Sequence, residues 1–290
     1  MKEFERYHPL VNLIYFVFVI VFACVFMHPV CLGVSFVCAF IYSILIKGFK
    51  RAIKSLCVIV PLILVTALVN PVFNHRGVTI LMYFPDGNPL TLESIIYGIG
   101  AAFMIASVIM WFSCFNEIMS SDKYVYLFGK IMPAMSLILS MVLRFVPKFK
   151  AQYKDIANAQ ICIGKDTSKG SLITRCKNTA KVVSINISRS LEESIDTADS
   201  MKSRGYGLEG RTAFSTYKFT TRDWTTLIFT LAACIYIFIG GILGNLNFYY
   251  FPTISGPAAS PYGVSLTVIY CLYCMLPILL EIKEARKWKY

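Results

Sequence analysis

Charged side chains are scarce in this sequence. Only 15% of its 290 residues are Asp, Glu, Lys or Arg, against about a quarter in an ordinary soluble domain, whereas 57% are hydrophobic. The three histidines, His8, His28 and His75, are far apart, so they suggest no shared metal site. The sequence also lacks a Gly-x-x-x-x-Gly-Lys-Ser/Thr loop, the usual phosphate cradle of an ATPase. These absences argue against a soluble enzyme and against a chain that hydrolyses ATP itself.

The hydrophobic residues are concentrated in long runs. Each run has roughly 15–22 residues, and about 20 residues are needed to cross the hydrocarbon core as a helix. We therefore predict an all-α polytopic membrane protein with about six transmembrane helices, namely Leu10–Met27, Val30–Ile46, Ser55–Val69, Ser94–Phe115, Thr225–Gly244 and Val264–Leu280.

The interiors of these runs carry no Asp, Glu, Lys, Arg or His. Ion-coupled and proton-coupled carriers usually keep ionisable groups at membrane depth, because a buried charge is costly unless it is used. A sodium site made of backbone carbonyls remains compatible with this composition. The uncharged runs therefore disfavour a stand-alone proton-coupled carrier.

Small residues and prolines interrupt the apolar runs. Pro61 and Pro277 are expected to kink their helices, because proline removes a backbone donor. Gly240 with Gly244 forms a small-xxx-small pair, and Gly98 begins a stripe of small residues that continues at Ala102 and Ala106. Both patterns predict close helix packing.

Basic residues are unevenly distributed between the apolar runs. Of the 28 Lys and Arg residues, only Arg76 lies in the loop 70–93 and none lies in the loop 244–263. Because cytoplasmic loops of membrane proteins are enriched in Lys and Arg, both termini and the segment 116–223 are predicted to be cytoplasmic. The net charge of +12 then fits contact with anionic headgroups or an acidic partner protein rather than with nucleic acid.

This charge pattern predicts three domains. Residues 1–115 form an N-terminal membrane domain with four spans, 116–223 form a cytoplasmic domain, and 224–290 form a C-terminal membrane part with two spans. Within the middle segment, the short apolar stretch Ile131–Phe145 is interpreted as a helix at the interface or against the spans.

Two long amphipathic helices are predicted after that stretch. Mostly apolar residues recur every three or four positions, first in Phe145, Phe149, Tyr153, Ile156, Gln160 and Ile163, and then in Leu172, Cys176, Ala180, Val183, Ile187, Leu191, Ile195, Ala198 and Met201. The helices are expected to end at Gly164 and Gly205, where glycine accepts a left-handed conformation, with the turn Lys165–Ser171 between them. The pair is interpreted either as an ordinary helical hairpin, or as a coupling device whose stripe packs on its neighbour and transmits a push to the membrane.

Two sequence motifs in this segment resemble a known family. Ala198-Asp-Ser-Met-Lys-Ser-Arg-Gly-Tyr-Gly207 is similar to the signature of the transmembrane T component of energy-coupling factor (ECF) transporters, the EcfT/CbiQ-like family. Arg144-Phe-Val-Pro147, followed by Ala159-Gln160, resembles an earlier motif of the same family. The chain departs from the family at Glu209, where proline is expected.

The resemblance implies a non-catalytic subunit of an ATP-driven importer in a bacterial or archaeal cell membrane. Its partners would be two ABC-type ATPase subunits, which bind the ATP, and a separate substrate-binding S component for a vitamin or metal ion. The chain itself would carry no cofactor, metal or catalytic residue.

The resemblance also implies where the ATPase subunits dock. Each docks on a helix end with an Ala-Arg-Gly-like triplet, which here corresponds to Ser203-Arg204-Gly205 and to Cys162-Ile163-Gly164, with Ile163 in place of the first arginine. The supporting motif residues are Arg144, Pro147, Gln160, Asp199, Met201, Tyr206 and Gly207.

Two other classes of function fit the sequence less well. A stand-alone secondary carrier is disfavoured by the uncharged spans. A membrane-embedded enzyme is disfavoured because no cluster of carboxylates or histidines at a membrane face could serve as acid, base or metal ligand.

Overall fold

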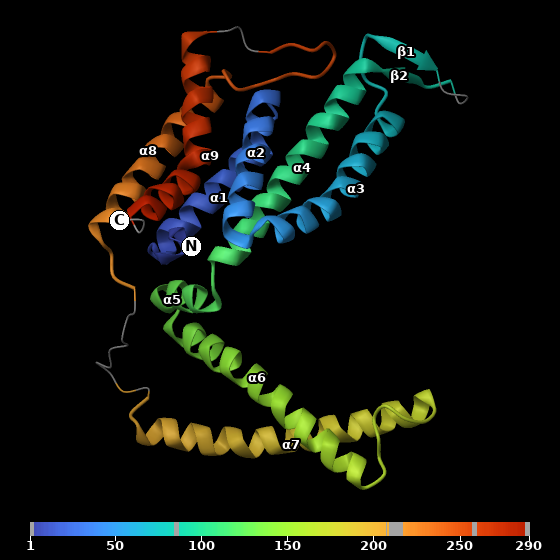
Figure 1. Ribbon diagram of the computed structural model, residues 1–290, viewed down its shortest axis with the longest axis vertical. Helices are drawn as coiled ribbons and strands as arrows, with labels where there is room; N and C mark the ends of the chain where they lie inside the picture. Colours follow the sequence, from blue (N-terminus) through green and yellow to red (C-terminus); the bar gives the residue numbers. More distant parts are fainter. Residues whose placement is uncertain (1–2, 84–86, 207, 209–216, 257–259, 288–290) are drawn as a thin grey trace. The chain divides into compact units, whose positions relative to one another are not determined.

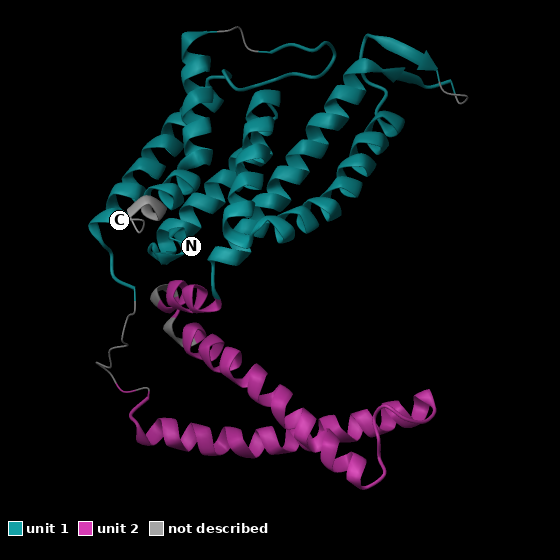
Figure 2. Cartoon of the chain, viewed as in Figure 1, with its two compact units in different colours: residues 1–120, 217–290 teal, residues 121–216 magenta. Residues whose placement is uncertain are grey.

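A computed structural model describes residues 3–83, 87–206, 208, 217–256 and 260–287. The chain divides into two compact units (Figure 2), the first made of residues 1–120 and 217–290 and the second of residues 121–216.

The first unit is a bundle of apolar helices that contains both ends of the chain (Figure 1). Its helices are α1 to α4, α8 and α9, preceded by the short 3-10 helix η1 and joined between α3 and α4 by the antiparallel pair β1 and β2. Their bounds are η1 Phe4–Arg6, α1 Pro9–Val25, α2 Pro29–Lys47, α3 Phe49–Phe73, β1 Ile80–Tyr83, β2 Pro89–Thr91, α4 Leu92–Ile118, α8 Thr221–Ile242 and α9 Pro261–Lys287.

The prediction of an all-α polytopic membrane protein is confirmed. Among the described residues, five helices are long and apolar enough to cross a membrane, namely α2, α3, α4, α8 and α9. The sixth predicted span is α1, an apolar helix of 17 residues. The predicted span Ser55–Val69 lies within α3, which is longer and has 25 residues. The helix begins directly after Gly48 and includes three basic residues in its first turns. Pro61 lies inside this helix, which bends along its length in Figure 1.

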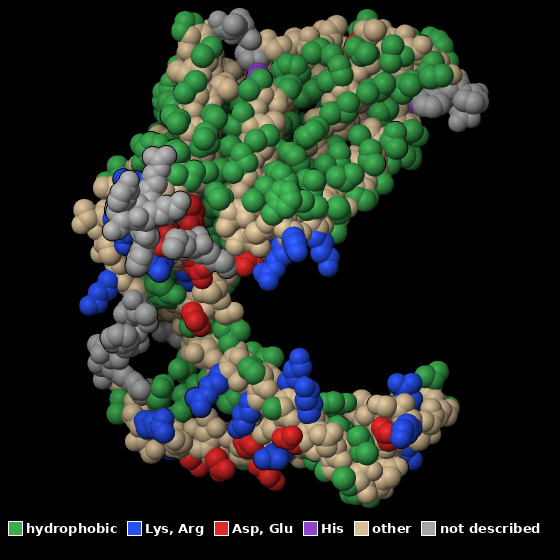
Figure 3. Space-filling model, viewed as in Figure 1, with side chains coloured by type: hydrophobic (Ala, Val, Ile, Leu, Met, Phe, Trp, Pro, Cys, Tyr) green, Lys and Arg blue, Asp and Glu red, His purple; other side chains and the backbone are tan. Residues whose placement is uncertain are grey.

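The outer surface of the first unit is largely hydrophobic, as the view in Figure 3 shows. Side chains such as Val58, Leu68 and Phe73 of α3 are 68% to 78% exposed. Apolar exposure on this scale is unusual for a water-soluble domain, whereas a bilayer covers such a surface without cost. The chain is therefore a multi-pass membrane protein.

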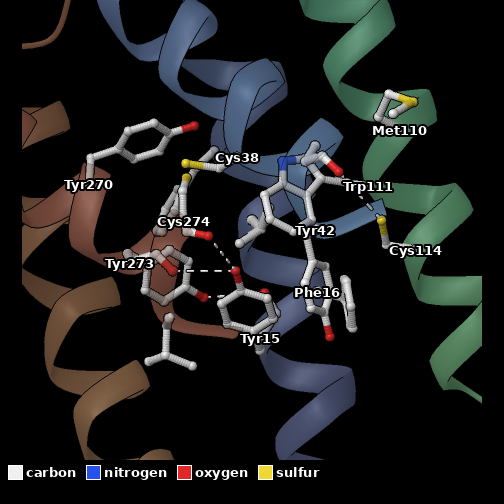
Figure 4. Close-up of a cluster of buried hydrophobic side chains, with 14 of the residues drawn as sticks. Tyr15, Phe16, Cys38, Tyr42, Met110, Trp111, Cys114, Tyr270, Tyr273 and Cys274 are labelled. Carbon is white, nitrogen blue, oxygen red and sulfur yellow. Dashed lines mark hydrogen bonds between the residues drawn. The ribbon is translucent and has the colours of Figure 1, made fainter. Parts of the chain in front are cut away.

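A cluster of aromatic residues forms the centre of the first unit (Figure 4). The Tyr15 hydroxyl of α1 donates to the carbonyl oxygen of Tyr273 in α9 at 3.3 Å, and the Tyr273 hydroxyl donates to the carbonyl oxygen of Tyr15 at 3.2 Å. Trp111 of α4 donates from Nε1 to Ser35 Oγ of α2 at 2.9 Å. Each of these three donors therefore has an acceptor, as buried polar groups usually do. Among the described residues, the buried Tyr42 hydroxyl and the buried Asn12 amide have no hydrogen-bond partner.

Glycines allow close helix contacts in this unit. A methyl group at Gly240 of α8 would lie 2.4 Å from Leu266 of α9, and one at Gly98 of α4 would lie 3.0 Å from the carbonyl oxygen of Ala67 in α3. The predicted packing role is confirmed for these two positions. It is wrong for Gly244, which follows the end of α8 with a φ of +79° and therefore serves as a turn residue.

In its described residues, the second unit has three helices, α5 Ser121–Ile131, α6 Pro133–Cys162 and α7 Leu172–Ser203. Pro133 occupies the first turn of α6, where the missing backbone donor costs nothing. The stretch 131–145 was predicted as a separate helix, which is wrong, because α6 runs without interruption from Pro133 through Phe145 to Cys162. Pro147 lies inside α6 and does not end it.

Candidate functional site

The helices α6 and α7 cross each other, as Figure 1 shows. At the crossing, Glu193 of α7 accepts a 2.7 Å hydrogen bond from Gln152 Nε2 of α6, and its other carboxylate oxygen lies 2.6 Å from Lys148 Nζ. Val182 of α7 and Ile156 of α6 are buried. The crossing therefore combines a polar tie with a small apolar contact.

The hydrogen bond from Lys148, followed by that from Gln152, lowers the pKa of Glu193 below its ordinary value. Arg189, one turn earlier on α7, also lies 3.4 Å from the same carboxylate. Glu193 is thus held in its charged form where α6 and α7 meet. The sequence did not predict this tie, because its signal is only a carboxylate on α7 and a lysine and an amide on α6.

The apolar stripe of α7 does not face α6 as predicted. Ile187, Leu191 and Ile195 are 55%, 63% and 65% exposed, whereas the buried residue is Val182, which is not part of the stripe. The reason is geometric, since two helices that cross touch over a short stretch and cannot bury a stripe that runs the length of one of them. Within the described part of the chain, this stripe is an uncovered apolar face.

The second helix end, Ser203-Arg204-Gly205, will be called the second tip. Gly205 has a φ of +74°, its backbone N–H donates to Lys202 O at 3.0 Å, and Tyr206 N–H donates to Met201 O at 3.1 Å. This pair of bonds is the Schellman motif, in which a left-handed glycine closes the helix and satisfies its last carbonyls. Arg204 is the cap residue and is exposed.

The first helix end, Cys162-Ile163-Gly164, will be called the first tip, and it has the same construction. Gly164 has a φ of +78°, its N–H donates to Ile161 O at 2.9 Å, and Lys165 N–H donates to Gln160 O at 2.9 Å. Ile163 is the cap residue and is 67% exposed. The predictions that α6 and α7 end at Gly164 and Gly205 are therefore confirmed, and Ile163 corresponds to Arg204 position by position.

The supporting motif residues occupy different places on the two helices. Gln160 and Met201 supply the carbonyl oxygens that close the two tips, and Tyr206 supplies a donor. Arg144, Pro147 and Asp199 are exposed, the first two on α6 before the crossing and the third one turn before the second tip. Gly207 and Glu209 lie outside the described residues.

The turn between the two helices is tied to the start of α7. Asn178 Nδ2 donates to Asp166 O at 2.9 Å, and Arg175 Nε donates to Thr167 O at 3.3 Å. The Asp166 carboxylate accepts from Ser168 N at 2.7 Å. The predicted turn Lys165–Ser171 is thus an ordered structure held against α7.

In the described part of the chain, no group of three or more His, Cys, Asp or Glu side chains is arranged to hold a metal ion. The two tips instead expose a guanidinium on one and an apolar side chain on the other.

Comparisons with known proteins show similarity to a family of transport proteins. A family model described as cobalt transport protein (CbiQ) matches residues 2–214 of the chain. A Lactobacillus helveticus (strain DPC 4571) protein named energy-coupling factor transporter transmembrane protein EcfT is 37% identical over 95 residues, which cover 32% of this chain and 34% of that protein.

Two further relatives carry the same name. The one from Exiguobacterium sibiricum is 36% identical over 99 residues, which cover 34% of this chain and 37% of that protein. The one from Bacillus selenitireducens is 30% identical over 112 residues, which cover 37% of this chain and 42% of that protein. The chain thus spans between a third and about two fifths of the length of these relatives.

Proposed function

We propose that this chain, which belongs to the cobalt transport protein (CbiQ) family, is the transmembrane T component of an ECF-type ABC importer. In this role it transmits the ATP-driven movement of two cytoplasmic ATPase subunits to a separate substrate-binding membrane protein, for uptake of a vitamin or a metal ion. Its relatives are named as transmembrane proteins of such transporters, which supports the assignment.

The observation that carries the proposal is the repeated helix end. Two long helices of one unit end in the same Schellman motif, with Ile163 and Arg204 at the same cap position. A structural hairpin needs no such repetition, because each helix could end in any of several ways. Two matching ends suit two similar partners, which is the number of ATPase subunits in the proposed complex.

The crossing of α6 and α7 gives the two tips a mechanical link. A force applied at either tip acts along a helix of 30 or 32 residues, roughly 45 Å long at 1.5 Å per residue. The tie between Glu193 and α6 passes that force from one helix to the other. The exposed stripe of Ile187, Leu191 and Ile195 offers the apolar surface on which a substrate-binding membrane partner would move.

In this proposal the chain performs no catalysis and binds no cofactor of its own. ATP is bound by the partner subunits, and the lipid bilayer surrounds the first unit. Both termini and the second unit face the cytoplasm, which the distribution of Lys and Arg supports.

Co-purification tests the function directly. Affinity purification of the tagged chain from native membranes, followed by mass spectrometry, should recover two ABC-type ATPase subunits and a small integral membrane protein. The complex should hydrolyse ATP, whereas the chain purified alone should not. Recovery of the chain without ATPase subunits would contradict the proposal, as would ATP hydrolysis by the isolated chain.

The orientation has its own test. A single cysteine at Lys169, whose side chain is 88% exposed, is introduced in a cysteine-free background. A membrane-impermeant maleimide should label it only after the cells are opened. Labelling of intact cells would place this turn outside and overturn the predicted topology.

A further inference from the structure

The two tips are alike in backbone and unlike in charge. Arg204 places a guanidinium at the cap of the second tip, whereas Ile163 leaves the cap of the first tip apolar. Docking at the second tip can use a charge-assisted hydrogen bond, and docking at the first cannot use one at the same position. The first tip therefore needs another source of charge if it meets a similar partner.

That charge is present in the turn and in the first turns of α7. Between residues 164 and 181 the chain carries five basic side chains, Lys165, Lys169, Arg175, Lys177 and Lys181, and a single acidic one, Asp166. The Asp166 carboxylate pairs with Lys169, with 4.0 Å between Asp166 Oδ2 and Lys169 Nζ. Lys165, Lys177 and Lys181 are all exposed, and these three residues will be called the lysine cluster.

The fold brings the lysine cluster to the first tip. Lys165 directly follows Gly164, and its backbone N–H closes the Schellman motif of that tip. The bonds from Asn178 and Arg175 to the turn hold it against α7, where Lys177 and Lys181 lie four residues apart and so on one face of the helix.

Among the described residues, no ion pair neutralises the three lysines of the cluster. Interaction with Lys181, followed by desolvation and the positive charge of Lys177, lowers the pKa of the Lys165 ammonium. Like charges held this close repel one another, so carboxylates brought by a partner would relieve the repulsion.

We propose that the lysine cluster is the electrostatic anchor of the first tip, and that it binds an acidic face of the ATPase subunit that docks there. Ile163 supplies the apolar contact beside the cluster. At the first tip, several side chains therefore share the binding task that Arg204 performs alone at the second tip. This inference rests on the proposed function, since it names the chemistry by which one of the two ATPase partners is held.

An anionic membrane surface is the competing partner for the same cluster. Leu172 and Ile173, which are 75% and 81% exposed, begin α7 beside it, and an apolar pair next to lysines is a common way to attach a helix to lipid. The ATPase is favoured because the cluster adjoins the cap position that corresponds to Arg204, and because Lys165 is itself part of that helix end.

The experiment compares three variants of the chain within the whole transporter. The first is the triple change Lys165→Ala, Lys177→Ala and Lys181→Ala. The second is Arg204→Ala, which reports on the second tip. The third is the control Lys150→Ala with Lys154→Ala, which removes exposed lysines from α6 outside the cluster. Native mass spectrometry without nucleotide counts the ATPase subunits per chain, and a salt titration measures how tightly each is held.

The triple variant should keep the subunit held by Arg204 and lose the other, with about tenfold weaker binding of that subunit and a smaller dependence on salt. The control should bind as the unchanged chain does. If the triple variant binds two subunits with unchanged salt dependence while Arg204→Ala loses one, the lysine cluster is not an anchor and the proposed function stands. If neither variant loses a subunit, the proposed function itself fails.

A nanodisc assay tests whether the cluster binds the membrane surface or the ATPase subunit. Nanodiscs of zwitterionic lipid and of lipid with anionic headgroups are used for the same complexes. Loss of the subunit in both lipids supports the proposal. A defect that appears only with anionic lipid would assign the cluster to the membrane surface and overturn it.

Discussion

Gln152 and Glu193 join the two helices that carry the candidate docking ends. The 2.7 Å hydrogen bond from Gln152 Nε2 to Glu193 Oε1 lies where α6 and α7 cross, beside the ion pair between Lys148 and Glu193. We predict that this polar tie sets the angle between the two helices.

We expect Glu193→Ala to loosen the crossing, since it removes both the hydrogen bond and the ion pair. Spin labels at positions 150 and 202, one on each helix, should give a broader distance distribution in this variant. Glu192→Ala is the matched control, because Glu192 is the exposed neighbour of Glu193 on α7. An unchanged distribution in Glu193→Ala would show that packing alone sets the angle.

The same tie predicts a dependence on pH. Lys148 and Gln152 lower the pKa of Glu193 from its ordinary value of 4.5. A carboxylate whose pKa is lower in the folded chain stabilises the fold fully above its unfolded pKa, and the stabilisation is lost as the pH falls through the folded value. The distance distribution should therefore be constant at neutral pH and broaden only below about pH 4.5. Broadening near pH 6 would point to a different group.

The glycines at the two tips should respond unequally to substitution by alanine. A left-handed conformation costs an L-residue about 1–2 kcal/mol, and both Gly164 and Gly205 adopt it. A methyl group at Gly205 would also lie 3.1 Å from Leu208 Cδ1, whereas one at Gly164 would meet no atom within 4 Å. Hydrogen exchange of the closing amides should therefore accelerate more in Gly205→Ala than in Gly164→Ala. Equal acceleration would show that backbone strain is the whole effect.

Within the first unit, Gly240→Ala should destabilise the contact of α8 with α9. The added methyl group would lie 2.4 Å from Leu266 Cδ1, so the fully buried Leu266 side chain would have to shift. Overpacking of this kind typically costs about 1–3 kcal/mol. Gly33→Ala is the control, because a methyl group there would meet no atom within 4 Å. The thermal midpoint in detergent should fall for Gly240→Ala alone.

Ile163 should act at the first tip through its shape and apolarity. Ile163→Leu keeps the volume and should leave assembly with the ATPase subunits unchanged. Ile163→Ala removes apolar area that docking would bury, which costs roughly 1–3 kcal/mol for a whole side chain. Pull-down of the ATPase subunits measures both variants. Equal recovery from Ile163→Ala and the unchanged chain would show that this side chain makes no contact in the complex.

The sequence predicted those features that depend on local patterns. Apolar runs of the length of a membrane indicated the spans, and Gly164 and Gly205 indicated the helix ends, because only glycine takes a left-handed conformation at little cost. The apolar stretch 131–145 and the amphipathic stripe that begins at Phe145 were predicted as two helices because the hydrophobic pattern changes there, whereas α6 runs through both.

The parts that could not be predicted depend on how distant segments meet. The stripe of α7 has the period of a helix face that packs on a partner, but the period does not say which partner covers it, and Ile187, Leu191 and Ile195 are exposed in this chain. The tie between Gln152 and Glu193 joins residues 41 positions apart. It follows from the crossing of two helices, which no local pattern encodes.

The most direct test of the proposed function is the recovery of ATPase subunits with variants of Arg204. Arg204→Lys keeps the charge and loses the planar fork of donors, and Arg204→Ala loses both. A charge-assisted hydrogen bond is worth about 1.5–3 kcal/mol, which corresponds to roughly ten- to hundredfold weaker binding. Lys202→Ala, in the same turn, is the control. We predict reduced recovery of the ATPase subunits with both Arg204 variants and full recovery with the control, whereas full recovery with both Arg204→Lys and Arg204→Ala would contradict the coupling role of this helix end.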